Sequence, residues 1–209
     1  MPLAREGYPL IGVTAAATLL LFLTGWTVPA GIALALTVFV VSFFRDPERT
    51  APEGAGLIVA PADGRVIKVA RVRDDRFLGG DAMLVSIFMS PFNVHVNRVP
   101  CGGRVLDVRY HRGKYFRAFA DKASLDNEQN AIVMEDERGQ RLCVVQIAGF
   151  IARRIVCYLR ADMHVERGQR CGMIMFGSRT DLYLPPTVRV RVNVGERARG
   201  GRTVVAEWP

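Results

Sequence analysis

The stretch from Gly7 to Phe44 contains no charged residue. It divides into two apolar segments, Pro9–Trp26 and Ala30–Phe44, around a break at Thr27–Pro29. Each segment is near the lower limit for a helix that crosses a bilayer, about 17–25 residues. The chain is therefore expected to fold as an N-terminal helical hairpin in residues 1–50, followed by a separate domain in residues 51–209.

Three arrangements of this hairpin compete. A two-pass hairpin is favoured because Arg5 at one end and Arg45 and Arg49 at the other place both ends on the cytoplasmic side. A shallow monotopic hairpin is the second. A cleaved signal peptide is the third, but it has a weak basic region (one Arg beside Glu6) and leaves the second apolar segment unexplained. The expected location is the inner membrane, with the domain on the cytoplasmic face.

The formal charge is +8 and the sequence pI about 9.9. A basic body tied to a membrane suits an anionic lipid surface, although the excess of arginine over lysine also fits a simple compositional bias. No basic helix or aromatic-interleaved basic stripe occurs, which argues against a nucleic-acid partner. The four cysteines show neither C-x-x-C nor zinc spacing, so free buried thiols and no metal site are expected.

After residue 56 the hydrophobic pattern changes from helical to alternating. The segments are short, rich in Val and Ile, and bounded by Gly, Pro or Asp, which indicates a mainly β fold of the sandwich or barrel kind. The expected strands are Leu57–Ala60, Arg65–Val72, Ala82–Met89, Asn93–Val99, Arg104–Tyr110, Ala131–Glu135, Arg141–Ala148, Ile151–Leu159, Gly172–Phe176, Leu182–Leu184, Val188–Val194 and Arg202–Glu207. Residues 118–130 are polar and predict a loop.

The three histidines narrow the search for a general base. His111 and His164 lie in charged, surface-like contexts. His95 lies among valines, on the strand face opposite Val94 and Val96 if the alternation holds. A lone histidine in a strand is more often a hydrogen-bonded structural residue than a catalyst.

Asp63, Gly177 and Ser178 are each ordinary in isolation. Asp63 lies in Pro-Ala-Asp-Gly, which is typical of a turn; its functional alternative is to orient a histidine. Ser178 is not in G-x-S-x-G, so a hydrolase elbow is not indicated. Gly177 before it would allow a strained backbone in which the Ser178 hydroxyl approaches the Gly177 carbonyl.

The combination is more specific than its parts. An apolar hairpin is followed by F-F-R-D-P, P-A-D-G, S-P-x-x-V-H, K-A-S-x-x-N-E and finally F-G-S-R. This order resembles the phosphatidylserine decarboxylase family, in its short bacterial and archaeal branch. The resemblance covers nearly the whole chain.

The resemblance implies a self-cleavage triad of Asp63, His95 and Ser178. It implies a cut between Gly177 and Ser178, giving a β chain of residues 1–177 and an α chain of residues 178–209 that stay partners. Two positions depart from the better-known pattern: Arg98 stands where the long branch has a second histidine, and Arg179 stands where a threonine is usual.

The implied chemistry is consistent with these residue types. With His95 as base, the Ser178 hydroxyl attacks the Gly177 carbonyl and exchanges the amide for an ester. Elimination releases the Gly177 carboxylate, and hydrolysis then yields ammonia and a pyruvoyl group from Ser178, the cofactor. Its ketone supplies the electron sink that decarboxylation of phosphatidylserine to phosphatidylethanolamine requires, and His95 is the candidate proton donor.

Rival functions remain open at this point. A membrane-anchored, non-enzymatic β-domain adaptor explains the anchor and strands but gives Asp63, His95 and Ser178 no joint role. A pyruvoyl decarboxylase of another amine lipid is a second rival, because the anchor argues for a lipid but the choice of headgroup is invisible in the sequence. A serine hydrolase is disfavoured, since self-cleavage consumes Ser178. A homo-oligomer is also left open.

Overall fold

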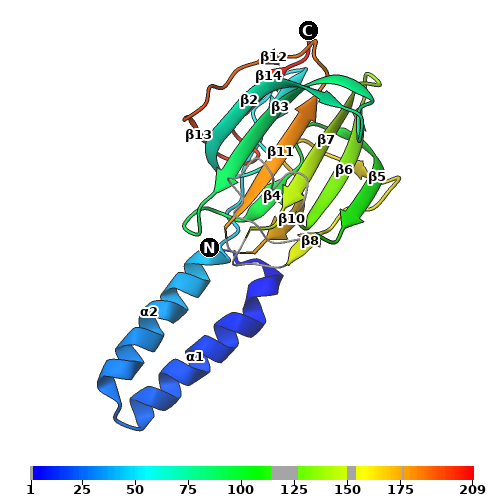
Figure 1. Ribbon diagram of the computed structural model, residues 1–209. Coiled ribbons are helices and arrows are strands. Elements are labelled where there is room, and N and C mark those ends of the chain that lie inside the picture. Colours follow the sequence, from blue (N-terminus) through cyan, green and yellow to red (C-terminus); the bar gives the residue numbers. More distant parts are fainter. Residues whose placement is uncertain (1, 114–126, 150–153, 176) are drawn as a thin grey trace. The chain divides into compact units, whose positions relative to one another are not determined.

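The computed structural model describes residues 2–113, 127–149, 154–175 and 177–209 (Figure 1). The chain divides into two compact units, Met1–Glu48 and Arg49–Pro209. The first is helical and the second is built from strands, so the mainly β fold class with an apolar helical N-terminus is confirmed.

The N-terminal unit is a helical hairpin. A 3₁₀ turn, Arg5–Gly7, leads into α1 (Tyr8–Leu23), and α2 (Thr27–Phe43) returns beside it (Figure 1). The hydroxyls of Thr18 and Thr37 join the two helices at 3.0 Å.

The break between the helices differs from the expected one. The chain turns at residues 24–26, where Gly25 has φ +76°, and not at Thr27–Pro29. Pro29 instead lies in the first turn of α2, where a missing backbone N–H leaves no helical hydrogen bond unmade.

Both helices of this unit expose large apolar side chains. Phe22 and Ile32 are each more than two-thirds exposed. Arg5–Leu23 is long and apolar enough to cross a membrane, with a mean hydropathy of 1.5, whereas Thr27–Phe43 is apolar but shorter. An apolar surface of this kind is costly in water and suits a lipid or protein environment.

The second unit contains fourteen strands in the part of the chain that is described. They are β1 (Leu57–Val59), β2 (Gly64–Asp74), β3 (Gly80–Met89), β4 (Val96–Arg98), β5 (Gly103–His111), β6 (Gln129–Asp136), β7 (Arg141–Ile147), β8 (Ile155–Cys157), β9 (His164–Val165), β10 (Arg170–Ile174), β11 (Ser178–Leu184), β12 (Arg189–Val190), β13 (Arg197–Ala198) and β14 (Val204–Glu207).

These strands form one large antiparallel sheet and two small ones. The large sheet has the order β13-β2-β3-β11-β7-β6-β5-β9 and curls into a half-barrel (Figure 1). The small sheets have the orders β4-β10-β8 and β1-β14-β12. All pairings are antiparallel, so every strand of the large sheet can alternate between an inner and an outer face.

The main core lies on the inner face of the curled sheet. Val85, Ile132 and Leu182 from the large sheet join Ile174 and Val205 from the two small sheets in one buried cluster. The small sheets therefore supply apolar partners to the inner face. A second, smaller cluster on the outer face is built around Cys143, Val145 and Tyr183.

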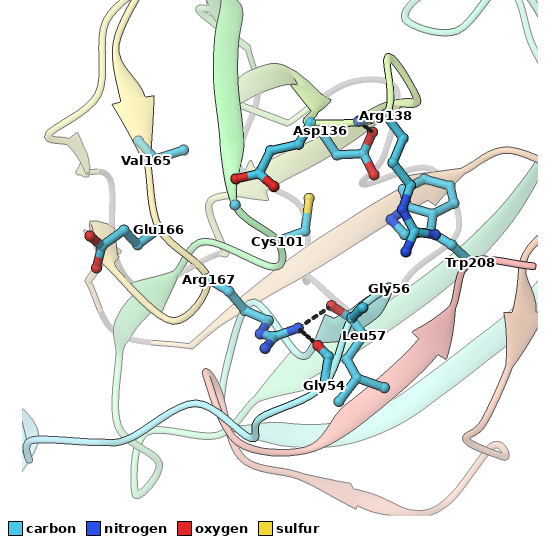
Figure 2. A pocket seen from close by; sticks show the side chains of 13 residues that line it. Gly54, Gly56, Leu57, Cys101, Asp136, Arg138, Val165, Glu166, Arg167 and Trp208 are labelled. Carbon is cyan, nitrogen blue, oxygen red and sulfur yellow. Dashed lines mark hydrogen bonds between the residues drawn. The ribbon is translucent and has the colours of Figure 1, made fainter.

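The first residues of the second unit, just before and at the start of β1, are held by Arg167. The Arg167 guanidinium donates to the carbonyls of Gly54 and Leu57 (Figure 2) and to that of Pro52. These contacts form one wall of a cavity of about 350 Å³. Cys101 also lines this cavity, but burial raises the pKa of its thiol to about 12, so the thiol stays protonated at neutral pH.

The cysteine prediction is confirmed for the described chain: all four are free thiols, with only Cys157 partly exposed. The strand prediction is correct for most elements, but several bounds differ. β4 and β12 are shorter than Asn93–Val99 and Val188–Val194, β11 begins at Ser178 and not at Leu182, and β9 and β13 were missed. Much of the expected loop at 118–130 lies outside the described residues, but its last two residues, Gln129 and Asn130, belong to β6.

Candidate active site

Ser178 is the first residue of β11, directly after the chain crosses from one sheet to another. β10 ends at Ile174 in a small sheet, and β11 begins in the middle of the large one. There Ser178 is the registered partner of Met89, the last residue of β3. The Gly177–Ser178 bond therefore lies at a corner between two sheets.

Gly177 has a backbone conformation that side chains disfavour. Its φ is +70°, in the left-handed region, and a Cβ placed on it would meet no atom of the described residues within 4 Å, its chain neighbours aside. The glycine is therefore favoured by backbone geometry and not by lack of space. Glycine adopts this conformation without strain, so the expected strained geometry at the bond stays a prediction.

A Gly177→Ala substitution is expected to slow any reaction that needs this geometry. An L-residue in the left-handed region costs about 1–2 kcal/mol, which lowers the population of the conformation by roughly 5- to 30-fold. Appearance of the cut product, followed over time by intact mass spectrometry, should slow by that factor. Gly79→Ala is the matched control, because Gly79 has φ +75° and equally open space in a distant hairpin. Equal slowing in both variants would contradict the prediction.

The Ser178 side chain is fully buried on the inner face. Its Oγ has no hydrogen-bond partner among the described residues, and the same holds for the Oγ1 of Thr180, two residues along the same face. Buried hydroxyls are nearly always satisfied, because leaving one unpaired costs about 1–3 kcal/mol. The unpaired hydroxyl does not distinguish Ser178 from Thr180, but Ser178 alone of the two directly follows a glycine in the left-handed region.

His95 comes to the same corner because two connections run side by side. β3 pairs with β11, and β4 pairs with β10. The β3–β4 connection, which ends at His95, and the β10–β11 connection, which ends at Gly177, must therefore bridge the same two sheets. The backbone confirms this, since the Ile174 N–H donates to the His95 carbonyl at 3.4 Å.

The His95 side chain is fully buried, and its hydrogen bonding defines its tautomer. Nδ1 lies 3.0 Å from the Asn93 carbonyl, which can only accept a hydrogen bond. Nδ1 therefore carries the proton in the neutral ring, and Nε2 is the basic nitrogen. His95 precedes β4, so the expected strand Asn93–Val99 does not include it and strand alternation does not define its face. His111 and His164 are exposed, as expected.

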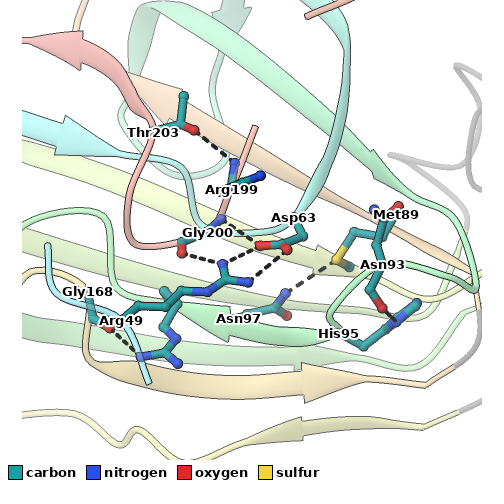
Figure 3. Close-up of polar contacts among 11 residues, drawn as sticks. Arg49, Asp63, Met89, Asn93, His95, Asn97, Gly168, Arg199, Gly200 and Thr203 are labelled. Atoms are coloured by element: carbon teal, nitrogen blue, oxygen red, sulfur yellow. Dashed lines mark hydrogen bonds and ion pairs between the residues drawn. The ribbon is translucent and has the colours of Figure 1, made fainter. Parts of the chain in front are cut away.

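Asp63 lies at the connection between β1 and β2, and its carboxylate faces an arginine. Arg49 binds both carboxylate oxygens, with an Nη2–Oδ2 distance of 2.8 Å, and the Gly200 N–H donates to Oδ1 at 2.8 Å (Figure 3). In this structure Asp63 and the His95 ring therefore have different hydrogen-bond partners. A role for Asp63 in orienting His95 stays a prediction.

The two arginines that depart from the family pattern have separate structural roles. Arg98 is buried and donates to the Gly168 carbonyl at 3.1 Å. Arg179 is 1% exposed and forms a bidentate ion pair with Asp181, at 2.6 and 2.7 Å. Because side chains alternate along β11, this pair lies on the outer face, away from the Ser178 hydroxyl.

A buried amide chain beneath the site was not predicted. Asn130 donates to Gln146, Gln146 donates to Asn97, and Asn97 contacts the sulfur of Met89, the partner of Ser178. Gln146 is also registered with Thr180 across β7 and β11. The available signal was the presence of amides at inward positions of otherwise apolar strands, which carry a cost unless they are fully paired.

The fold and the site together define a class of protein: a mainly β catalytic domain that buries a serine at a crossing between sheets, joined to an apolar helical unit. The chain belongs to the phosphatidylserine decarboxylase family, whose family model matches residues 36–206.

Curated relatives match over nearly the full chain and carry the name phosphatidylserine decarboxylase proenzyme. The protein of Solidesulfovibrio magneticus is 51% identical over 98% of this chain and 95% of its own length. Those of Geobacter sulfurreducens and Geotalea uraniireducens are 48% and 46% identical, each over 100% of this chain and 97% of their own length. The chain is accordingly an enzyme precursor of this family.

Proposed function

We propose that the chain is a phosphatidylserine decarboxylase precursor that cuts itself between Gly177 and Ser178 and carries a pyruvoyl group made from Ser178. The observation that carries the proposal is the fully buried Ser178 hydroxyl, which has no partner in the described chain and directly follows a glycine at φ +70°. The relatives named proenzymes support a precursor that is processed.

Self-cleavage needs a base and an activated hydroxyl. Nε2 of His95 accepts the Ser178 proton, because the Asn93 carbonyl holds the other ring nitrogen protonated. The Ser178 Oγ attacks the Gly177 carbonyl carbon, the amide C–N bond breaks, and the amine takes a proton. Loss of the Ser178 Cα proton then expels the Gly177 carboxylate, and water converts the resulting enamine to the pyruvoyl ketone and ammonia.

The site fits the finished group as well as the precursor. The pyruvoyl ketone supplies the electron sink for decarboxylation of the substrate amino acid. Ser178 is fully buried on the inner face of the large sheet, and Met89, its registered partner on β3, is buried as well. In this proposal His95 returns a proton to the substrate carbon.

The two chains formed by the cut remain partners in this proposal. The segment from Ser178 begins with β11, which is hydrogen-bonded to β3 on one side and β7 on the other. The apolar N-terminal unit holds the enzyme at the membrane that contains its substrate. Arg5, Arg45 and Arg49 favour the cytoplasmic face of the inner membrane for the β unit.

Intact mass spectrometry of the purified protein tests the proposal. We expect two chains, residues 1–177 and residues 178–209, with no free amine at the start of the second. Phosphatidylethanolamine and CO₂ should form from phosphatidylserine, while vesicles with a threonine headgroup report on substrate choice.

Intact mass spectrometry also tests whether His95 is the base for self-cleavage. A His95→Gln chain is expected to accumulate uncut, because general-base catalysis contributes about 10²- to 10⁴-fold. His164→Gln, an exposed histidine, is the matched control and should be cut normally. A single uncut chain in active wild-type protein would overturn the pyruvoyl proposal.

A further inference from the structure

Three arginines face one pocket at the edge of the large sheet. Arg197 on β13 is the registered cross-strand partner of Arg65 on β2, and Arg199 follows two residues later. All three line a cavity of about 610 Å³, together with Asp63 and Phe92. We call the cavity the arginine pocket.

This arrangement costs stability in the free protein. Like charges directly opposite each other on neighbouring strands repel. Within the described chain, no ion pair joins any of the three guanidinium groups to a carboxylate. The one carboxylate that lines the pocket, Asp63, is bound by Arg49, and neighbouring Glu196 accepts a hydrogen bond from Asn193. The pocket is therefore positively charged and lacks an internal counter-ion.

We propose that the arginine pocket binds the phosphodiester of the phospholipid headgroup. This inference rests on the proposed function and deepens it by naming the residues that hold the substrate. Guanidinium forks match phosphate oxygens in geometry and charge. The cavity volume lies within the range of small-molecule sites, about 300–1,000 Å³.

Two features favour a lipid headgroup over free phosphate. Phe92 at the pocket is 75% exposed and offers an apolar surface beside the arginines, which suits an amphiphile. Ser90 and Asn93 also line the pocket, and the Asn93 carbonyl holds His95. In phosphatidylserine only one oxygen and one methylene separate phosphorus from the carbon that loses CO₂. Arg65 lies on the outer face of the large sheet, because it is registered with Phe88 and Phe88 with Arg179. The headgroup would therefore reach the loop that carries the proposed base from the Asn93 side of the pocket, at the end of the sheet.

Binding is best measured on the full chain carrying Ser178→Ala, so that the result does not depend on self-cleavage or turnover. The probe is glycerophosphoserine, a soluble headgroup, titrated by calorimetry. Arg65→Gln, Arg197→Gln and Arg199→Gln are each expected to weaken its binding about tenfold, since each removes a charge-assisted contact. Arg71→Gln is the matched control, because Arg71 is exposed on the same strand, β2, outside the pocket.

Three further probes separate the sources of binding. Serine without phosphate should not bind in an arginine-dependent way. Inorganic phosphate should bind more weakly than glycerophosphoserine; equal binding would mean a free-phosphate site and overturn the lipid assignment. Binding to phosphatidylglycerol vesicles measures the effect of bulk negative charge. If Arg71→Gln weakens binding of glycerophosphoserine or of these vesicles as much as Arg197→Gln does, the lipid assignment is also overturned.

The experiments distinguish failure of the headgroup site from failure of the proposed decarboxylase function. A variant that combines Arg65→Gln, Arg197→Gln and Arg199→Gln separates the two. If wild-type protein is cut and decarboxylates phosphatidylserine while this variant still binds glycerophosphoserine normally, the arginine pocket is the wrong site. If wild-type protein is neither cut nor active but the arginine-dependent binding remains, the pocket stands and the decarboxylase proposal falls. Melting curves of each variant establish that the fold is retained.

Discussion

Replacing Ser178 with alanine is expected to leave one uncut chain with decarboxylase activity at background. The substitution removes the only atom that attacks the Gly177 carbonyl in the proposed reaction and the precursor of the pyruvoyl ketone together. Because Ser178 is buried without a hydrogen-bond partner in the described chain, its loss breaks no native hydrogen bond there. The variant should therefore fold as well as the wild type or slightly better. Intact mass and CO₂ release measure the two losses.

Ser86→Ala provides the matched control for this experiment. Ser86 is a fully buried serine on β3 of the same sheet, and its hydroxyl also lacks a partner among the described residues. It is registered with Asp181 and not with the corner residues. This variant should be cut and active. Normal cleavage of the Ser178→Ala chain at the same bond would exclude Ser178 as the nucleophile.

Asp181→Ala is expected to destabilise the protein by about 3–5 kcal/mol. The substitution leaves the Arg179 guanidinium buried after its bidentate partner is lost, and the side chains of this pair are only 2% and 0% exposed. Removing one member of a buried ion pair costs this much because an uncompensated charge stays in a medium of low dielectric constant. Urea unfolding in the Ser178→Ala background, where the chain is uncut, measures the change.

The chain contains a closely matched surface pair for comparison. Asp107 and Arg109 on β5 have the same two-residue spacing and an Nε–Oδ2 distance of 2.6 Å, but their side chains are 43% and 58% exposed. Asp107→Ala should cost only about 0.2–1 kcal/mol. A double change, Arg179→Met with Asp181→Leu, should recover most of the loss. Equal effects of Asp181→Ala and Asp107→Ala would show that burial of the pair is unimportant.

Local patterns in the sequence were sufficient for most of the fold. Alternating apolar residues located β2, β3, β5, β6 and β7, because these strands are long and contribute to a buried inner face. β9 and β13 contain two residues each, which is too short for any periodicity. The start of β11 was missed because Arg179 and Asp181 read as polar loop residues, whereas they neutralise each other inside the protein.

The candidate site residues Ser178, His95 and Asp63 come from spaced motifs, and their roles stay predictions. Their contacts could not be predicted from the sequence. The pairing of Asp63 with Arg49 depends on a distant backbone turn at Gly200, which no local pattern encodes. The arginine pocket depends on the register of β13 against β2. Register is set by long-range pairing, so scattered arginines in the sequence gave no sign that they converge.

The position of β11 affects whether the protein can refold after the proposed cut. The proposed cut falls at the first residue of a strand that lies between β3 and β7, and the segment that follows also supplies β12, β13 and β14. Before the cut, assembly of these sheets is an intramolecular event. Afterwards it would require two separate polypeptides to meet, so recovery from denaturant would depend on protein concentration. The precursor thus has the chain connectivity that favours folding, and the processed enzyme keeps a structure that it would not readily rebuild.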